Sequence, residues 1–204
     1  MMDVIHIKKP WECYAFENFL PPERWKTIRE LAQEQLDNYK PNARYGQGVY
    51  FCKEDILPET NELIHKYKLP DRGYEGKLKK ILHWAISPPN WFYPIHCDAI
   101  GRVTTSILYV APEECDGTVL HKNLSKNDNA DHIGAELPSE YEHEVKWKPN
   151  TLFYHQCLPN KTWHSIQNTT GSPRIVLSSF LVQPDLIPKN RNFSDQILDT
   201  EPFL

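Results

Sequence analysis

Short apolar segments separated by turn residues recur along most of this 204-residue chain. The two strongest are residues 102–111 (RVTTSILYVA) and 173–182 (PRIVLSSFLV), which are rich in the β-branched side chains that favour strands. The chain has 17 prolines against eight glycines, which indicates many strand ends and few long helices. Several short strands with turns between them are typical of a sandwich or a barrel. Further strands are expected over residues 12–20, 80–87, 91–98, 145–155 and 161–168.

Two helices are expected beside these strands. Pro22 suits the first turn of a helix, and the apolar residues between Glu23 and about Gln35 recur at helical spacing. A second, shorter helix is expected over residues 59–68, because Pro70 cannot continue it. The predicted fold class is therefore mainly β with flanking helices.

The length of the chain fits one domain, residues 1–204. The core is expected over about residues 10–183, with residues 184–204 as a C-terminal tail on the surface. Residues 121–144 are polar and mostly without periodicity, so a long loop is expected there. A loop of this length in a compact domain indicates a functional or a disordered segment.

Composition argues against several classes of protein. The net charge is −4 and no basic block is present, which disfavours nucleic acid as the main partner. No apolar run is long enough for a transmembrane helix, and the first residues lack the apolar core of a secretory signal. The five cysteines are widely spaced without a CxxC pair, which favours reduced thiols. We therefore expect a cytoplasmic protein with no membrane partner.

One pair of residues carries the pattern of a metal site. Of the nine histidines, only His96 is followed two residues later by an acid, Asp98. On a strand, residues i and i+2 point to the same face, so an imidazole and a carboxylate would converge. A third ligand from another strand would complete a facial triad of two histidines and one carboxylate, which suits Fe(II) and leaves coordination positions open. The pair alone is a weak signal, because one such match is expected by chance.

A cation further along the chain supports the same hypothesis. If the metal binds a 2-oxo acid, a basic residue must pair with the far carboxylate, and arginine matches a carboxylate bidentately. Among the later histidines only His164 has a basic residue ten positions on, Arg174, at the start of the strongest predicted strand. A charged head on an apolar sheet face needs a partner, and a bound dicarboxylate would be one. Exposure of Arg174 at the strand start is the alternative.

The order of these motifs resembles a known family. The segments YPIHCD (93–98), TSILY (105–109), Asp116–Gly117, TWHS (162–165) and Arg174 are together similar to the iron(II)- and 2-oxoglutarate-dependent oxygenases. The resemblance is greatest to the prolyl-4-hydroxylase-like branch in its small microbial and phage form. It covers roughly residues 10–183 and implies a double-stranded β-helix, or jelly-roll, core.

The resemblance also implies roles for individual residues. His96, Asp98 and His164 would bind Fe(II), and Arg174 and Tyr109 would bind the far carboxylate of 2-oxoglutarate. It implies a dioxygenase that uses O2 and hydroxylates a peptidyl residue or a small metabolite, releasing succinate and CO2. Ascorbate would be an optional further cofactor.

The substrate side is expected at three loops, residues 39–58, 88–94 and 121–144, which carry aromatic and basic side chains. Arg102, at the start of the strand that follows the metal pair, is expected to face solvent. Two alternatives stay open. One is a cupin-like metalloenzyme that does not use 2-oxoglutarate and has no role for an inward Arg174. The other is a non-enzymatic jelly-roll binding module, which would not need the triad.

Overall fold

We describe the protein from a computed structural model. The structure describes residues 1–40, 46–67, 78–98, 101–123, 139–158, 161–186 and 197–198.

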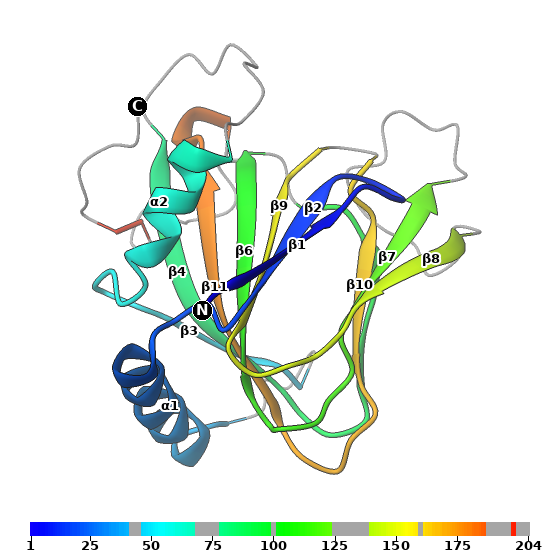
Figure 1. The fold of residues 1–204 in the computed structure, drawn as a ribbon. Helices are drawn as coiled ribbons and strands as arrows, with labels where there is room; N and C mark the ends of the chain where they lie inside the picture. Colours follow the sequence, from blue (N-terminus) through cyan, green and yellow to red (C-terminus); the bar gives the residue numbers. More distant parts are fainter. Residues whose placement is uncertain are drawn as a thin grey trace.

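Two antiparallel sheets face each other across the described part of the chain (Figure 1). In the larger sheet the strand order is β1 (Asp3–Ile7), β2 (Cys13–Glu17), β9 (Thr151–Gln156), β6 (Arg102–Ala111), β11 (Arg174–Val182), β4 (Lys79–Ser87) and β3 (Gly48–Phe51). In the smaller sheet it is β5 (Trp91–His96), β10 (His164–Asn168), β7 (Thr118–Asn123) and β8 (Ser139–Val145). From β4 to β11 the chain places four strands in each sheet, which is the eight-stranded jelly roll that the sequence resemblance implies.

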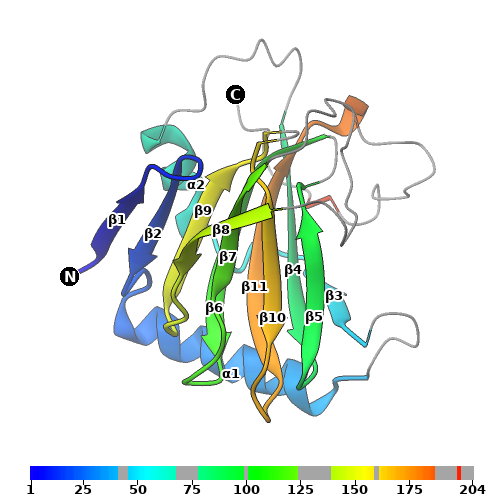
Figure 2. The ribbon, with the colours of Figure 1, turned by 90° about the vertical axis from the view of Figure 1, so that its right-hand side faces the viewer.

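Helices cover the outer face of the larger sheet. α1 (Pro22–Asp37) and α2 (Glu59–Lys66) lie on the side away from the smaller sheet, and Figure 2 shows α1 running behind both sheets. Both helices confirm the sequence prediction, and a short 3-10 helix follows β11 at Pro184–Leu186. No helix among the described residues has both the length and the apolar character needed to cross a membrane.

Side chains alternate between two apolar layers along each strand of the larger sheet. On β11, Ile175 and Leu177 belong to the layer beneath the helices, while Val176 belongs to the layer between the sheets. Arg174 and Ser178 flank Val176 at two-residue spacing, so they share its face. The strand therefore directs a charged and a hydroxyl side chain into the space between the two sheets.

Several elements differ from the sequence prediction. The strands β1 and β3 were not expected, and the predicted loop 121–144 contains the end of β7 and all of β8 except its last residue, Val145. Residues 124–138 of that loop lie outside the described residues. The strand β8, with the sequence SEYEHEV, is polar along most of its length, so its pairing with β7 rather than apolar alternation makes it a strand.

The prediction that residues 184–204 form a surface tail is also partly wrong. Leu198 is buried in the layer beneath the helices, and its backbone nitrogen donates to the Lys80 carbonyl. Ile197 forms an antiparallel bridge with Ile81 on β4. An isolated pair of apolar residues in a polar segment gives no periodic signal, which is why the sequence did not reveal this contact.

Candidate metal centre and adjoining cavity

The three predicted metal ligands come together between the sheets. His164 on β10 is the register partner of His96 on β5, and Asp98 follows β5 after one residue. One ligand atom from each of the three side chains lies within 4.8 Å of the others, and all three residues are buried. The pairing of β5 with β10 therefore joins residues 68 positions apart into one potential metal site.

Hydrogen bonds to the backbone set the orientation of both imidazoles. His96 donates from Nδ1 to the Pro94 carbonyl over 2.9 Å, and His164 donates from Nδ1 to the Thr162 carbonyl over 3.0 Å. A carbonyl only accepts, so Nδ1 carries the proton and Nε2 of the neutral ring presents a lone pair. Metal-binding histidines are held in the same way in other proteins. Burial, with His164 close by, lowers the pKa of His96 to about 3, so this ring is neutral at pH 7.

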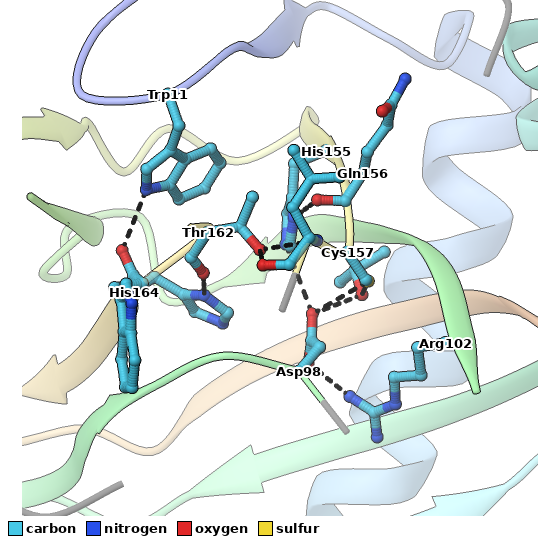
Figure 3. A network of polar contacts seen from close by, with 11 residues as sticks. Trp11, Asp98, Arg102, His155, Gln156, Cys157, Thr162 and His164 are labelled. Atoms are coloured by element: carbon cyan, nitrogen blue, oxygen red, sulfur yellow. Dashed lines mark hydrogen bonds and ion pairs between the residues drawn. The ribbon is translucent and has the colours of Figure 1, made fainter. Parts of the chain in front are cut away.

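The Asp98 carboxylate is held from two sides (Figure 3). Arg102 donates from Nη1 to Oδ1 over 2.6 Å, and Thr105 donates from Oγ1 to Oδ2 over 2.7 Å. Burial opposes ionisation, but the Arg102 guanidinium holds the pKa of this carboxyl well below its usual range. The expectation that Arg102 faces solvent was wrong. Its side chain is 27% exposed, with the guanidinium 3.8 Å from the centre of the Phe180 ring.

The donor set fits a divalent iron centre. Two imidazole lone pairs and one carboxylate form a compact triad, which leaves coordination positions on the metal for other ligands. A zinc enzyme often has similar donors, but the HExxH pattern of the metalloproteases is missing from the sequence.

A cavity of about 240 Å³ adjoins the triad and reaches from it to Arg174. Arg174 is 1% exposed, so exposure at the strand start is ruled out. Its Nε and Nη2 atoms are buried and have no hydrogen-bond partner among the described residues. Burial of such a cation is costly unless an anion accompanies it. Two described rings lie beside the Arg174 guanidinium, that of Trp147 at 4.8 Å from Cζ and that of Tyr109 at 5.5 Å from Cζ.

Tyr109 lies beside Arg174 but is not one of the residues that line the cavity. It is fully buried, its ring stacks on Trp147 at 4.6 Å, and its hydroxyl donates to Thr118 Oγ1 over 2.7 Å. Burial raises the pKa of Tyr109 to about 12, so the hydroxyl keeps its proton.

The exposed side of the cavity lies where edge strands of the two sheets approach. Val49 and Phe51 come from β3, and Trp91 and Tyr93 come from β5. These residues fall in two of the three loops predicted on the substrate side, 39–58 and 88–94. The third, 121–144, lies partly outside the described residues.

Sequence reasoning missed three groups around the triad. Arg102 and Thr105 hold Asp98, and His155 lies 3.5 Å from the same carboxylate. The sequence did contain a signal for Thr105. It lies on the predicted strand that follows His96 and Asp98, at even spacing from Tyr109, so the two side chains share one face of that strand. His155 carried no local signal, because the pairing of β9 with β6 brings it opposite Thr105.

Comparison with known proteins gives the fold a precedent. No protein-family model and no curated protein matches the sequence. Among solved structures, a prolyl-4-hydroxylase from Pseudomonas putida aligns with a TM-score of 0.57 at 18% identity, over 83% of this chain and 91% of that one. SnoN, a non-heme α-ketoglutarate-dependent epimerase from nogalamycin biosynthesis, aligns with a TM-score of 0.64 at 14% identity, over 94% and 88%.

A viral collagen prolyl hydroxylase from Paramecium bursaria Chlorella virus 1, solved with 2-oxoglutarate, aligns with a TM-score of 0.53 at 14% identity, over 82% of this chain and 93% of that one. The chain has the fold of these enzymes. A further SnoN structure holds Fe3+ and α-ketoglutarate. The double-stranded β-helix expected from the sequence is thus confirmed as the fold shared with 2-oxoglutarate-dependent non-heme iron enzymes.

Proposed function

We propose that this protein is an Fe(II)- and 2-oxoglutarate-dependent dioxygenase that hydroxylates a peptidyl residue. The observation that carries the proposal is Arg174, a buried cation on the same cavity as the His96–Asp98–His164 triad, whose Nε and Nη2 make no hydrogen bond to any described residue. A cupin-like metalloenzyme or a binding module has no use for this arginine. The shared fold with 2-oxoglutarate-dependent enzymes supports the same choice.

Each residue of the site has a defined task in this proposal. His96, Asp98 and His164 hold the iron, and Arg174 holds the far carboxylate of 2-oxoglutarate, with Tyr109 beside it. Bound iron, with 2-oxoglutarate and O2, supplies the oxidation of a substrate C–H bond and the release of succinate and CO2.

The chain itself orients the ligands and excludes water. The Pro94 and Thr162 carbonyls fix the tautomers of the two histidines, so both Nε2 lone pairs face the metal position. Arg102 keeps Asp98 ionised and limits its rotation. Apolar side chains line the cavity between the triad and Arg174, which removes water around the charged groups and strengthens their interactions. They include Ile107, Ile166 and Val176.

The size of the cavity favours a peptidyl substrate over a free metabolite. A volume of about 240 Å³ is below the range of roughly 300–1,000 Å³ typical of pockets that enclose a drug-sized ligand. In this proposal 2-oxoglutarate fills the part of the cavity beside Arg174, one side chain of the substrate enters beside the triad, and the rest of the peptide stays at the open side. Two apolar residues of β3 on the cavity wall, Val49 and Phe51, are exposed. In this proposal they contact the peptide chain beside the inserted residue.

We also propose that residues 1–204 act as one catalytic domain in a reducing compartment such as the cytoplasm. The five cysteines form no disulfide with one another, in keeping with such a compartment.

An anaerobic titration tests the cosubstrate site. Fe(II) and then 2-oxoglutarate are added while visible absorbance is recorded. We expect a weak charge-transfer band that requires both components and disappears in His164→Ala. Arg174→Ala should need far more 2-oxoglutarate, whereas Arg29→Ala, which changes a half-exposed arginine on α1, should match the wild type. A folded wild type without the band would favour the cupin-like or binding-module alternatives.

A turnover assay tests the substrate class. Succinate release is compared between a peptide pool and a pool of free amino acids, with and without ascorbate. The proposal requires stimulation by peptides. Stimulation by free amino acids alone would assign a small metabolite instead.

A further inference from the structure

A second group of metal-binding side chains lies on the far side of Asp98 from Arg102. His155 is in β9, and Cys157 follows the end of that strand. His155 Nε2 is 3.5 Å from Asp98 Oδ2, and Cys157 Sγ is 3.4 Å from the same oxygen. Potential ligand atoms of all three residues lie within 4.8 Å of one another, and all three residues are buried. Figure 3 shows both residues directed at the carboxylate.

The orientation of His155 leaves an unsatisfied atom in this group. Its Nδ1 donates to the Gln156 carbonyl over 2.9 Å, so Nε2 of the neutral ring is an acceptor. Nε2 is buried and makes no hydrogen bond within the described part of the chain. It faces a carboxylate oxygen, which is also an acceptor. Two acceptors at this distance repel each other unless a cation lies between them.

The distances are close to those between ligands of a tetrahedral ion. Zinc binds sulfur at about 2.3 Å and nitrogen or oxygen at about 2.0–2.2 Å, which places tetrahedral ligands roughly 3.3–3.6 Å apart for two nitrogen or oxygen atoms and roughly 3.5–3.7 Å apart when one is sulfur. The separation of 3.5 Å between His155 Nε2 and Asp98 Oδ2 falls in the first range, and that of 3.4 Å between Cys157 Sγ and Asp98 Oδ2 lies just below the second. Thr105 Oγ1 donates to Asp98 Oδ2 over 2.7 Å and lies 3.2 Å from Cys157 Sγ, so it acts beside this group as a hydrogen-bond donor that orients the carboxylate.

We propose that Asp98, His155 and Cys157 form a second cation site, specific for a thiophilic divalent ion of the zinc class, which shares Asp98 with the iron triad. Sulfur gives the site its selectivity, because thiolate favours zinc-class ions over the hard cations that prefer oxygen ligands. An ion bound here draws on the charge of a carboxylate that the triad also needs. Under the proposed function, occupation of this site therefore weakens iron binding at His96, Asp98 and His164.

Cobalt(II) is a suitable probe, because a thiolate ligand gives it a charge-transfer absorption in the near ultraviolet that nitrogen and oxygen ligands do not. The full chain is stripped with a chelator, kept reduced without air, and titrated with Co(II) alone. We expect the thiolate band in the wild type and its loss in Cys157→Ser. Cys52→Ser removes a cysteine in the segment after β3 and should keep the band. His155→Gln should weaken cobalt binding by about tenfold or more.

A variant of the triad separates this proposal from the proposed function. His164→Ala removes an iron ligand that the second site does not use, so the thiolate band should persist. A folded wild type that binds cobalt without the band, in a manner that requires His164, would overturn the second site and support the iron centre. A band that persists in Cys157→Ser and in Cys157→Ala would overturn it as well, because the sulfur ligand would then be another cysteine.

Discussion

Arg102 Nη1 donates to Asp98 Oδ1 over 2.6 Å, and the same guanidinium covers the ring of Phe180. The predicted metal ligand is therefore neutralised by a cation of the protein itself. A metal ion at the triad would share this role, so the chain's own charge and the metal both stabilise a buried carboxylate.

Replacement of Arg102 tests this relationship. We expect Arg102→Met to lower the free energy of unfolding of the metal-free protein by about 1–3 kcal/mol, because Asp98 loses its main charged partner. Mn(II) should then raise the melting temperature more in Arg102→Met than in the wild type, since the ion replaces the missing cation. Differential scanning calorimetry with and without Mn(II) measures both effects. Equal shifts in the two proteins would show that Arg102 does not compensate the carboxylate.

Substitution of Arg174 should separate stability from cosubstrate binding. Arg174→Met removes a buried charge whose Nε and Nη2 have no hydrogen-bond partner among the described residues, so we expect the free energy of unfolding to rise by about 1–3 kcal/mol in urea titrations. The same variant should raise the KM for 2-oxoglutarate by about 100-fold or more. Arg174→Lys keeps the charge but loses the bidentate fork, and an intermediate KM is expected. A stable variant with an unchanged KM would remove Arg174 from the cosubstrate site.

His83 should make the protein sensitive to acid. Burial, with Arg102 nearby, lowers the pKa of His83 from 6.5 to about 3. Between these values the unfolded chain binds more protons than the native one, so stability is complete above pH 6.5 and falls as the pH falls. Between pH 7 and pH 5 we expect the free energy of unfolding of His83→Leu to fall by about 2 kcal/mol less than that of the wild type. Urea unfolding at the two pH values measures the difference, and identical losses would contradict the assignment.

Lys80 anchors the segment before α2. Its ammonium group is fully buried and donates to both oxygens of Asp55, to the Leu57 carbonyl and to Asn61 Oδ1, over 2.7–3.0 Å. Lys80→Met should lower the free energy of unfolding by about 3–5 kcal/mol, because Asp55 is left without its cation. The double variant Lys80→Met/Asp55→Leu should recover part of this loss in the same chemical denaturation assay. A double variant as unstable as the single one would place the loss in packing rather than in charge.

Local patterns predicted the parts of the site that lie on one strand. Alternation along β5 explains why the sequence pair His96 and Asp98 indicated convergence, and the apolar run of β11 made the charged Arg174 conspicuous. Contacts made by strand pairing could not be predicted in the same way. His155 reaches Asp98 only because β9 pairs with β6 in one register, in which Thr105 is its partner. A shift by one residue would turn His155 to the other face of the sheet.

The elements of the fold differ in the same way: those with a local sequence pattern were predicted, and those formed through strand pairing or an isolated contact were not. The helices and the apolar strands β4, β6 and β11 were predicted because each carries its own periodicity or β-branched run. The strand β8 was missed because its side chains are polar, and it gains its conformation from hydrogen bonds to β7. Leu198 was missed because one buried leucine in a polar segment produces no pattern.

The position of Arg174 has a kinetic consequence under the proposed function. Arg174 is 1% exposed, whereas Val49 and Phe51 on the cavity wall at β3 are 44% and 37% exposed. Under that proposal we expect 2-oxoglutarate to reach Arg174 through the space that the substrate side chain occupies afterwards. We therefore expect binding in a compulsory order, with the cosubstrate first and succinate leaving after the modified peptide. Succinate should then compete with 2-oxoglutarate for the empty enzyme and not with the peptide.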